Sequence, residues 1–356
     1  MILRLEIENF RGFQQVVLDE LRSVNLIVGG NDTGKTSLLE ALVLLLGDSG
    51  ALRSLPITFR TNQTGGNSTD DQNDRENFWS WLFYDRNADH RITINARLDS
   101  QATIGVRTEL LPTPNFPNGP VEPVLTRTDS RITDDGRIHR PGMPKGDVRL
   151  LQFGNHQFSV MGGNSPDDFR VAVLSTRPTN PTIDAENYNQ VALLADGERR
   201  VEQVMREIEP RLKRLRYAKL PGTTSPLIFA DVGLSRAVPS TQMGQAFNRI
   251  LHIYTQVLAL KMNVLLIDEI ENGIFSESMP VVWRGLMAIC EQEGVQIFAT
   301  THSRECVMAA HAVAHECSKD ELCVQRLQIV KGKVEAVRLG IQHLEMAAEM
   351  GLEVRS

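Results

Sequence analysis

The chain has 356 residues, of which 41% are hydrophobic and 23% charged, and its formal net charge is −6 at pH 7. These values are typical of a globular protein with a buried core. The acidic balance argues against a protein that coats nucleic acid, because phosphate binding needs a basic field. A local basic groove is still compatible with it. The densest basic run lies between Arg199 and Lys219, and a solvated helix face is its simpler interpretation.

The N-terminal segment MILRLEIENF alternates apolar and charged residues, which predicts a half-buried strand and not a secretory leader. The longest apolar run, ALVLLL at 41–46, is too short to span a bilayer. The four cysteines form no CxxC pair. We therefore expect a cytoplasmic protein with reduced thiols and no membrane partner.

The strongest motif is the segment VNLIVGGNDTGKTSLLEALVLLL at 24–46. An apolar run that predicts a buried strand leads into the pattern Gly-x-x-x-x-Gly-Lys-Thr, and leucines at helical spacing follow it. In this motif the glycines let backbone N–H groups face the phosphates, the lysine reaches the β- and γ-phosphates, and the threonine ligates Mg²⁺. Lys35 is therefore a catalytic candidate and Thr36 a metal ligand. The ATP-binding candidates are Gly30, Asn31, Asp32, Thr33, Gly34, Lys35, Thr36 and Ser37.

The segment VPSTQMGQAFNRIL at 238–251 precedes an amphipathic helix whose N-terminus can point at an anion. Its polar residues are candidates to contact such an anion. A simple helix cap is the alternative interpretation. The candidate loop residues are Thr241, Gln242, Met243, Gly244 and Gln245.

Two carboxylates end the next apolar run, in the segment NVLLIDEIENGIF at 263–275. The run 264–267 predicts a second buried strand. Asp268 fits the Mg²⁺ side of a phosphoryl-transfer site, and Glu269 fits the general base that orients the attacking water. The pair alone would be weak evidence, because acidic residues often end strands, but the upstream phosphate loop strengthens it.

A third strand pattern, VQIFATTHSRE at 295–305, also ends in polar residues. Ligands of open parallel sheets bind beyond the carboxyl ends of the strands. His302 lies at such an end, and we expect it to contact the γ-phosphate as a further catalytic residue.

The segments NFRGF (9–13), GNDTGKTSLLEAL, LLIDEIENG and IFATTHS resemble the ABC-type ATPases of the SMC/RecF/OLD group. They resemble in particular the stand-alone OLD-like ATPases of anti-phage systems such as Gabija, Septu and PARIS. The resemblance extends to ENFWSWLFYD (76–85), REIEPRLKRLR (206–216) and MGLEVRS (350–356). It implies ATP and Mg²⁺ as cofactors, Arg11 near the nucleotide, and an ATP-sandwich homodimer or higher homo-oligomer whose signature loop, at 241–245, acts in trans.

Two positions depart from the pattern of this group. The signature of related chains reads roughly P-L-S-S-M-G-x-G, whereas this chain has Gln242 for the second serine and Ala246 for the last glycine. The usual E-N-G-L-H sequence ends here in Phe275. We therefore expect slow ATP hydrolysis that depends on dimerisation, and altered communication between the paired sites.

The predicted fold class is α/β, a P-loop NTPase of the ABC-ATPase type with a mixed sheet flanked by helices. We expect one domain over 1–356, with core halves at about 1–60 and 225–340 and a β-rich and helical insert at about 61–224. Seven prolines predict an irregular excursion at 111–147. No sustained heptads occur, which excludes a long coiled coil. LQIVKGKVEAVRL at 327–339 predicts a hairpin, and 341–350 a closing helix.

Three functions fit these features. The resemblance favours the sensor or scaffold subunit of an anti-phage complex that controls a separately encoded nuclease or toxin, because no room follows His302 for a nuclease domain. The alternatives are a RecF-like repair ATPase that acts on DNA and an ATP-held scaffold with little turnover. DNA binding is possible under the second hypothesis and is not established by the sequence.

Overall fold

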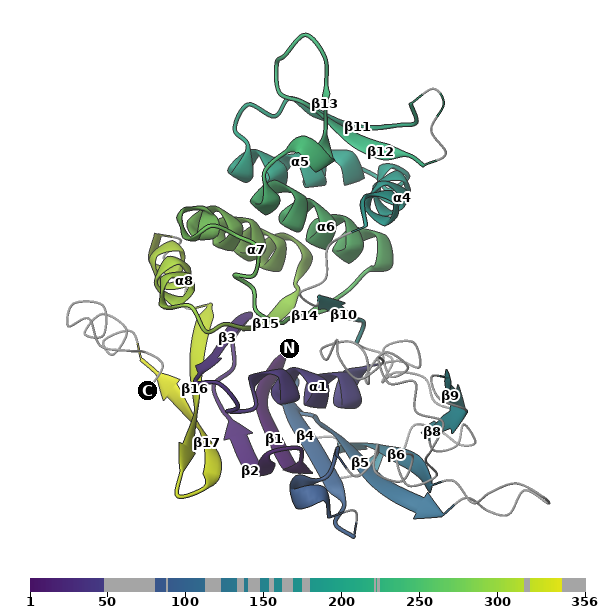
Figure 1. The fold of residues 1–356 in the computed structure, drawn as a ribbon, viewed down its shortest axis with the longest axis vertical. Coiled ribbons are helices and arrows are strands. Elements are labelled where there is room, and N and C mark those ends of the chain that lie inside the picture. The colour runs from purple at the N-terminus through teal and green to yellow at the C-terminus, as the bar shows by residue number, and fades with distance from the viewer. Residues whose placement is uncertain are drawn as a thin grey trace, which may run out of the picture.

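The computed structural model describes residues 1–47, 81–87, 89–112, 123–132, 138–139, 148–153, 157–161, 169–174, 180–220, 222, 225–316 and 321–340. An antiparallel sheet, a buried helix, a mainly parallel sheet and a helical lobe follow one another as layers (Figure 1). The expected helix at 341–350 lies outside these residues. Among the described residues, no helix has the length and apolar character needed to cross a bilayer.

The antiparallel sheet begins with the N-terminal strand, whose alternation of apolar and charged residues gives it one buried face. Its path is β2-β1-β4-β5-β6-β8-β9, and β7 pairs with β6. The strands are β1 (Ile2–Phe10), β2 (Phe13–Leu18), β4 (Ile92–Leu98), β5 (Thr103–Pro112), β6 (Pro123–Ile132), β7 (Ile138–His139), β8 (Val148–Phe153) and β9 (Gln157–Met161).

The second sheet has the order β10-β14-β15-β3-β16-β17, and only β17 is antiparallel to its neighbour. The middle strands β3, β14 and β15 are buried on both faces, which explains their continuous apolar sequences. The bounds are β3 (Val24–Gly29), β10 (Val171–Leu174), β14 (Val264–Ile267), β15 (Gln296–Thr300), β16 (Leu322–Val330) and β17 (Lys333–Leu339).

Helix α1 (Lys35–Leu46) lies between these two sheets, and its residues from Ser37 to Leu46 are all buried. A helix that is apolar on every side needs such a position, because no face of it favours water. The side chain of Gln296 fastens the sheets at another point, donating to the backbone oxygens of Ile2 at 2.7 Å and Arg22 at 2.8 Å.

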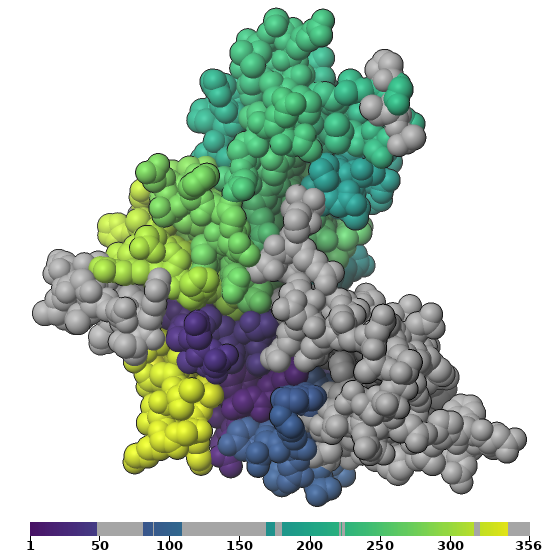
Figure 2. Space-filling view, in the orientation of Figure 1, coloured from purple at the N-terminus to yellow at the C-terminus, as the bar shows by residue number. Residues whose placement is uncertain are grey.

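The other face of the second sheet is covered by helices, which continue into a lobe closed by a three-stranded sheet (Figures 1 and 2). The helices are α4 (Pro181–Ala192), α5 (Gly197–Ile208), α6 (Gln245–Leu260), α7 (Met279–Glu293) and α8 (Arg304–Glu316). The strands are β11 (Arg214–Ala218), β12 (Leu227–Asp231) and β13 (Val238–Pro239). Short 3₁₀ turns are η1 (Tyr84–Arg86), η2 (Ser240–Gln242) and η3 (Ser276–Ser278).

The predicted α/β class with a mixed sheet and flanking helices is confirmed, and the helix that follows the P-loop motif lies between the layered sheets. The hairpin expected at 327–339 is also confirmed, with Lys331 and Gly332 in the left-handed turn conformation. The longest helix among the described residues is α6, with 16 residues.

The expectation of an irregular excursion throughout 111–147 is wrong for part of that range. Pro123–Ile132 forms the ten-residue strand β6, which pairs along its whole length with β5. Pro112, the last residue of β5, lies opposite Pro123, the first residue of β6. Proline is compatible with the first residue of a strand, so these prolines mark the ends of strands and not their absence.

The described residues of the range 61–224, which we expected to be an insert within one domain, add strands and helices to the layers of the core. Strand β10 pairs in parallel with β14 of the second sheet, β4 pairs with β1, and α4 and α5 pack against α6. Strands β10 and β14 are about ninety residues apart, and parallel pairing over that separation leaves no local sequence pattern. For this reason the sequence predicted an insert and not a strand of the second sheet.

Candidate functional site

The candidate site lies where three neighbouring parallel strands end. Strands β14, β15 and β3 are adjacent in the sheet, and the segments that follow them carry Asp268 and Glu269, His302, and the P-loop. A cavity of about 970 Å³ opens there. It is lined by the predicted residues Arg11, Asn31, Asp32, Thr33, Gly34, Lys35, Thr36, Ser37, Asp268, Glu269 and His302.

The P-loop requires glycine at both ends for steric reasons. Gly29 has φ +151°, and a Cβ there would lie 2.5 Å from the backbone oxygen of Leu327. Gly34 has φ +93°, and a Cβ there would lie 2.7 Å from the ring of Phe13. Between them, the Thr33 hydroxyl donates to the oxygen of Gly30 at 3.0 Å. These contacts hold the loop in one shape before any nucleotide binds.

The N-terminus of α1 opens directly behind this loop. Its N-cap is Gly34, no side chain caps it, and its first turn has no acidic residue. The free N–H groups and the helix dipole therefore favour an anion at this point. The ammonium of Lys35 donates to the oxygens of Gly29 at 2.9 Å and Gly30 at 2.7 Å.

Burial lowers the pKa of Lys35 below its ordinary value, and the nearby carboxylates, Asp268 first among them, act in the opposite direction. A phosphate beside the ammonium would add another negative charge and favour the protonated form further.

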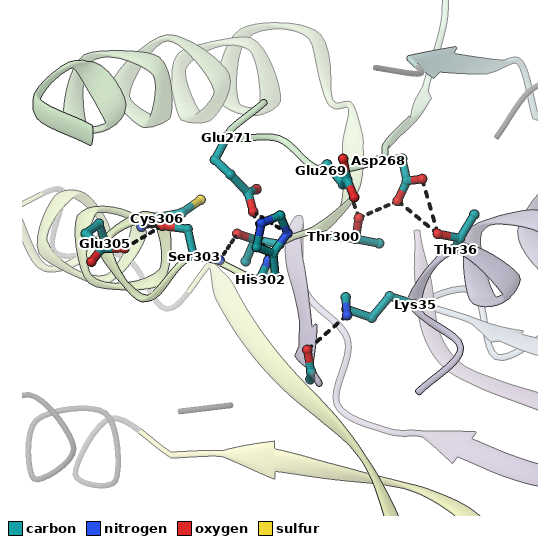
Figure 3. A network of polar contacts seen from close by, with 12 residues as sticks. Lys35, Thr36, Asp268, Glu269, Glu271, Thr300, His302, Ser303, Glu305 and Cys306 are labelled. Atoms are coloured by element: carbon teal, nitrogen blue, oxygen red, sulfur yellow. Dashed lines mark hydrogen bonds and ion pairs between the residues drawn. The ribbon is translucent and has the colours of Figure 1, made fainter. Parts of the chain in front are cut away.

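Three side chains connect the ends of the strands to α1 (Figure 3). The hydroxyl of Thr300 donates to Asp268 Oδ1 at 2.6 Å, and the hydroxyl of Thr36 donates to Asp268 Oδ2 at 3.2 Å. The N–H of Glu269 donates to the Thr300 hydroxyl at 2.8 Å. Burial raises the pKa of Asp268, while the hydrogen bonds from both threonines and the charge of Lys35 oppose the rise.

These residues fit a magnesium ion. Thr36 and Asp268 offer adjacent hydroxyl and carboxylate oxygens, the ligands that Mg²⁺ prefers. Among the described residues, four carboxylates line the cavity, those of Asp32, Asp85, Asp268 and Glu269, together with the cations of Arg11, Lys35 and Arg86. The carboxylates would repel the negative charges of a triphosphate unless a divalent cation bound together with it.

Glu269 is one of three cavity carboxylates, with Asp32 and Asp85, whose backbone φ is positive. Its φ is +46°, in the left-handed region that non-glycine residues seldom adopt. The bond from its N–H to Thr300 holds the backbone there, and the residue lines the cavity. Strained backbone of this kind is common at functional sites.

His302 is held by a partner that the sequence did not suggest. Glu271 Oε1 accepts from the N–H of His302 at 2.9 Å and lies 3.0 Å from His302 Nδ1 (Figure 3). If Nδ1 carries the proton donated to this carboxylate, Nε2 is the ring nitrogen available to the cavity. The imidazole is half exposed, with the cavity on one side.

Arg11 lines the cavity, but its guanidinium is engaged by the protein. Its Nε and Nη2 lie 3.0 and 3.2 Å from the two oxygens of Glu40, whose side chain is 1% exposed. Its Nη1 also donates to the backbone oxygen of Trp81 at 3.2 Å. These contacts indicate that Arg11 stabilises one wall of the cavity, because its guanidinium is already bound to protein groups and is not available to a phosphate.

The candidate signature loop does not line the cavity of its own chain. Thr241, Gln242, Gly244 and Gln245 are exposed, and Met243 is half-buried against the helical core. The loop does lie near the segment that follows the carboxylates, since Gln245 Oε1 is 3.8 Å from where a Cβ on Gly273 would be. Phe275, in the same segment, is 80% exposed.

The sequence placed Thr300 at the end of a strand beside the site without giving it a role, and it gave no role to Glu271 or to the wall formed by Trp81 and Arg86. The contacts of Thr300 with Asp268 and Glu269 join two strands and were not predicted. Glu271 and Trp81 had no local signal, since what defines them is a contact with a residue distant in sequence.

Replacing Asp268 with asparagine is expected to stabilise the metal-free protein while removing Mg²⁺-dependent ATP binding. A raised pKa in the folded state means that the ionised carboxylate costs stability at neutral pH. We expect a rise in Tm on the order of 2 °C at pH 7. The gain should vanish below about pH 4, where the carboxyl is also protonated in the unfolded chain. An unchanged or lower Tm at pH 7 would contradict this account.

The fold and this edge of the sheet define a P-loop ATPase of the ABC type. Comparison with known protein families identifies the family more closely. A family model described as "AAA ATPase domain" matches residues 1–159. A second, described as "AAA domain, putative AbiEii toxin, Type IV TA system", matches residues 126–307, more than half of the chain. The chain belongs to this AAA ATPase family.

Individual relatives are more distant. The "ATP/GTP phosphatase" of Helicobacter pylori is 21% identical over an alignment 350 residues long, which covers 89% of this chain and 89% of that protein. The "DNA replication and repair protein RecF" of Nitrosococcus oceani is 36% identical over 80 residues, 19% of this chain and 22% of that protein. A solved structure titled "Crystal structure of the SmcHead bound to the C-winged helix domain of ScpA" covers 96% of this chain and 98% of its own, with 13% identity and a TM-score of 0.47.

Proposed function

We propose that this ATPase binds ATP with Mg²⁺ in the cavity and hydrolyses it slowly. The observation that carries the proposal is that one cavity gathers Lys35, the pair Asp268 and Glu269, and His302 from the ends of three adjacent strands. The name of the Helicobacter pylori relative supports nucleoside triphosphate hydrolysis as the reaction. The P-loop amides and the N-terminus of α1 would hold the phosphates.

In the proposed reaction each side chain has a separate task. Lys35 leaves the loop oxygens that it now contacts and pairs with the β- and γ-phosphates. Thr36 and Asp268 would hold Mg²⁺, which supplies charge neutralisation at the phosphates. Glu269 accepts a proton from the attacking water, and His302, oriented by Glu271, contacts the γ-phosphate. ADP and phosphate are the products.

We also propose that the site is completed by a second copy of the chain. Thr241, Gln242, Gly244 and Gln245 are exposed and absent from their own cavity, which fits a loop that contacts the nucleotide of the partner. Gly244 has open space around its Cα, so a backbone N–H there can approach a phosphate closely. Gln242 can donate through its amide in place of the usual serine hydroxyl.

A mixing experiment tests this arrangement. Glu269→Gln removes the base, and Gly244→Asp adds a negative charge to the loop without a clash in its own chain. Each variant alone should be inactive. A 1:1 mixture should recover about a quarter of the wild-type rate, because half of the dimers are then heterodimers with one intact site each. Ser100→Asp adds the same charge at an exposed residue between β4 and β5 that does not line the cavity, so it is the control and should be active by itself.

A mixture that stays inactive, while Gly244→Asp alone remains fully active, would refute the trans role of the loop. Absence of turnover in the wild-type chain, despite measurable ATP binding, would favour the ATP-held scaffold instead.

At the level of the cell, we propose that ATP binding and turnover control a separate effector in anti-phage defence. The motif resemblance to OLD-like defence ATPases and the toxin wording of the matching family description support this role. Cells carrying the gene with its neighbouring genes should restrict phage plating, and Glu269→Gln should alter that restriction. Equal plating with and without the gene would oppose the proposal.

A RecF-like activity on DNA is the second candidate, favoured by the 36% identity to RecF over 80 residues. It predicts that DNA stimulates ATP hydrolysis most at low salt, where electrostatic affinity is greatest. Hydrolysis that is independent of DNA under those conditions would rule it out.

A further inference from the structure

One wall of the cavity has no part in the chemistry described so far. Asp268, Glu269 and His302 reach the cavity from the second sheet, whereas residues 81–86 reach it from the antiparallel sheet. Phe83 forms a bridge with Phe10 at the end of β1, and the N–H of Arg11 donates to the oxygen of Leu82 at 2.8 Å. The cavity is therefore bordered by catalytic carboxylates on one side and by this segment on the other.

The segment presents a flat, stacked pair of side chains. The guanidinium carbon of Arg86 lies 3.5 Å from the ring centroid of Trp81, and both residues line the cavity. The indole is 45% exposed, a high value for the largest aromatic side chain. Stacked aromatic and guanidinium planes bind a further flat π system well, because dispersion and the ring quadrupole both favour it.

The pair is also held firmly in place. The backbone oxygen of Trp81 accepts from Arg11 Nη1 at 3.2 Å, and Arg11 is itself clamped by the buried carboxylate of Glu40 on α1. Asp85 and Arg86 have φ values of +52° and +55°, two consecutive left-handed residues that must be stabilised by their surroundings. Because Glu40 belongs to the helix that begins at the P-loop, the same helix positions both the phosphate site and this wall.

We propose that Trp81 and Arg86 form the nucleobase platform of the nucleotide site, with the base of the bound triphosphate stacked on this pair. Arg11 and Glu40 are positioning residues for the platform. The inference rests on the proposed function, since a triphosphate in the P-loop leaves its nucleoside to fill the rest of the cavity. Stacking is tolerant of base identity but increases with ring area, so purine nucleotides should bind more tightly than pyrimidine nucleotides.

Calorimetric titration with Mg²⁺ and either ATP or inorganic tripolyphosphate separates base binding from phosphate binding. Trp81→Ala should weaken ATP binding about tenfold or more and leave tripolyphosphate binding unchanged. Trp81→Phe should restore most of the ATP affinity, and CTP should bind the wild type more weakly than ATP does. Tyr217→Ala, which removes an aromatic residue of similar exposure on β11, is the matched control and should behave as the wild type.

Each result decides the matter. Trp81→Ala that binds ATP as tightly as the wild type, or that loses ATP and tripolyphosphate alike, would overturn the platform and leave the proposed ATPase standing. A wild-type chain that binds neither ligand would overturn both. Fluorescence gives a second readout: the chain has three tryptophans, and the part of the ATP-dependent change in emission that comes from Trp81 should be lost in Trp81→Phe.

Discussion

Replacing Glu269 with glutamine is expected to lower the steady-state rate of ATP hydrolysis by about 10²–10⁴-fold, the usual contribution of a general base. Glutamine keeps the size and the backbone bond to Thr300, so the strained conformation at φ +46° should persist. The affinity for ATP should change little. Because product formation is then blocked, the ATP-bound state should accumulate, and with it any nucleotide-dependent dimer.

Phosphate release and nucleotide binding should both be measured over a range of protein concentrations. Wild-type turnover per chain should rise with concentration if two copies form each site. Glu207→Gln, an exposed glutamate on α5 far from the cavity, is the control and should keep full activity. Residual hydrolysis by Glu269→Gln within a few-fold of the wild type would mean that another group orients the water.

Replacing Lys35 with alanine is expected to weaken ATP binding by about 10- to 100-fold, the equivalent of one lost charge-assisted hydrogen bond. The ammonium is the cation of the P-loop and already lies within 2.9 Å of two loop oxygens. Because burial lowers the pKa of Lys35, we also expect ATP binding to depend on pH. The ATP affinity of the wild type should decline at alkaline pH, starting below the value of about 10.4 at which an ordinary lysine titrates.

Calorimetric titration of ATP with Mg²⁺ from neutral to alkaline pH measures both effects. The alkaline decline should be absent from Lys35→Ala, whose affinity is low throughout. Lys213→Ala removes an exposed lysine of the lobe and should bind as the wild type does at every pH. ATP affinity in Lys35→Ala equal to that of the wild type would mean that the triphosphate lies elsewhere.

The local parts of the site were predictable because their chemistry lies in short stretches of chain. The P-loop has its glycines where positive φ and close backbone contact require them. The carboxylates and His302 follow apolar runs that read as buried strands, and carboxyl ends of parallel strands meet at one edge. The predicted β hairpin at the C-terminal side also depended only on neighbouring residues.

Other features were invisible in the sequence because they depend on partners far along the chain. Nothing near Glu40 indicates that it clamps Arg11, and nothing near Trp81 indicates that it faces the P-loop. The strand β10 was assigned to an insert, although it pairs with β14. The prolines of 111–147 suggested irregular chain where β6 in fact pairs with β5. A proline shows where a strand can end, but it does not show whether the residues after it pair with another strand.

The sequence by itself determined the class of protein, an α/β P-loop ATPase, and it predicted most of the residues that line the cavity, to which we assign contacts with phosphate, metal and water. Short-range backbone sterics and strand periodicity suffice for that. Only the tertiary structure decided that Glu271 orients His302, that Thr300 joins Asp268 to the backbone of Glu269, and that the signature loop lies outside its own cavity. These relations arise from packing between distant segments, where no local pattern records which residues will meet.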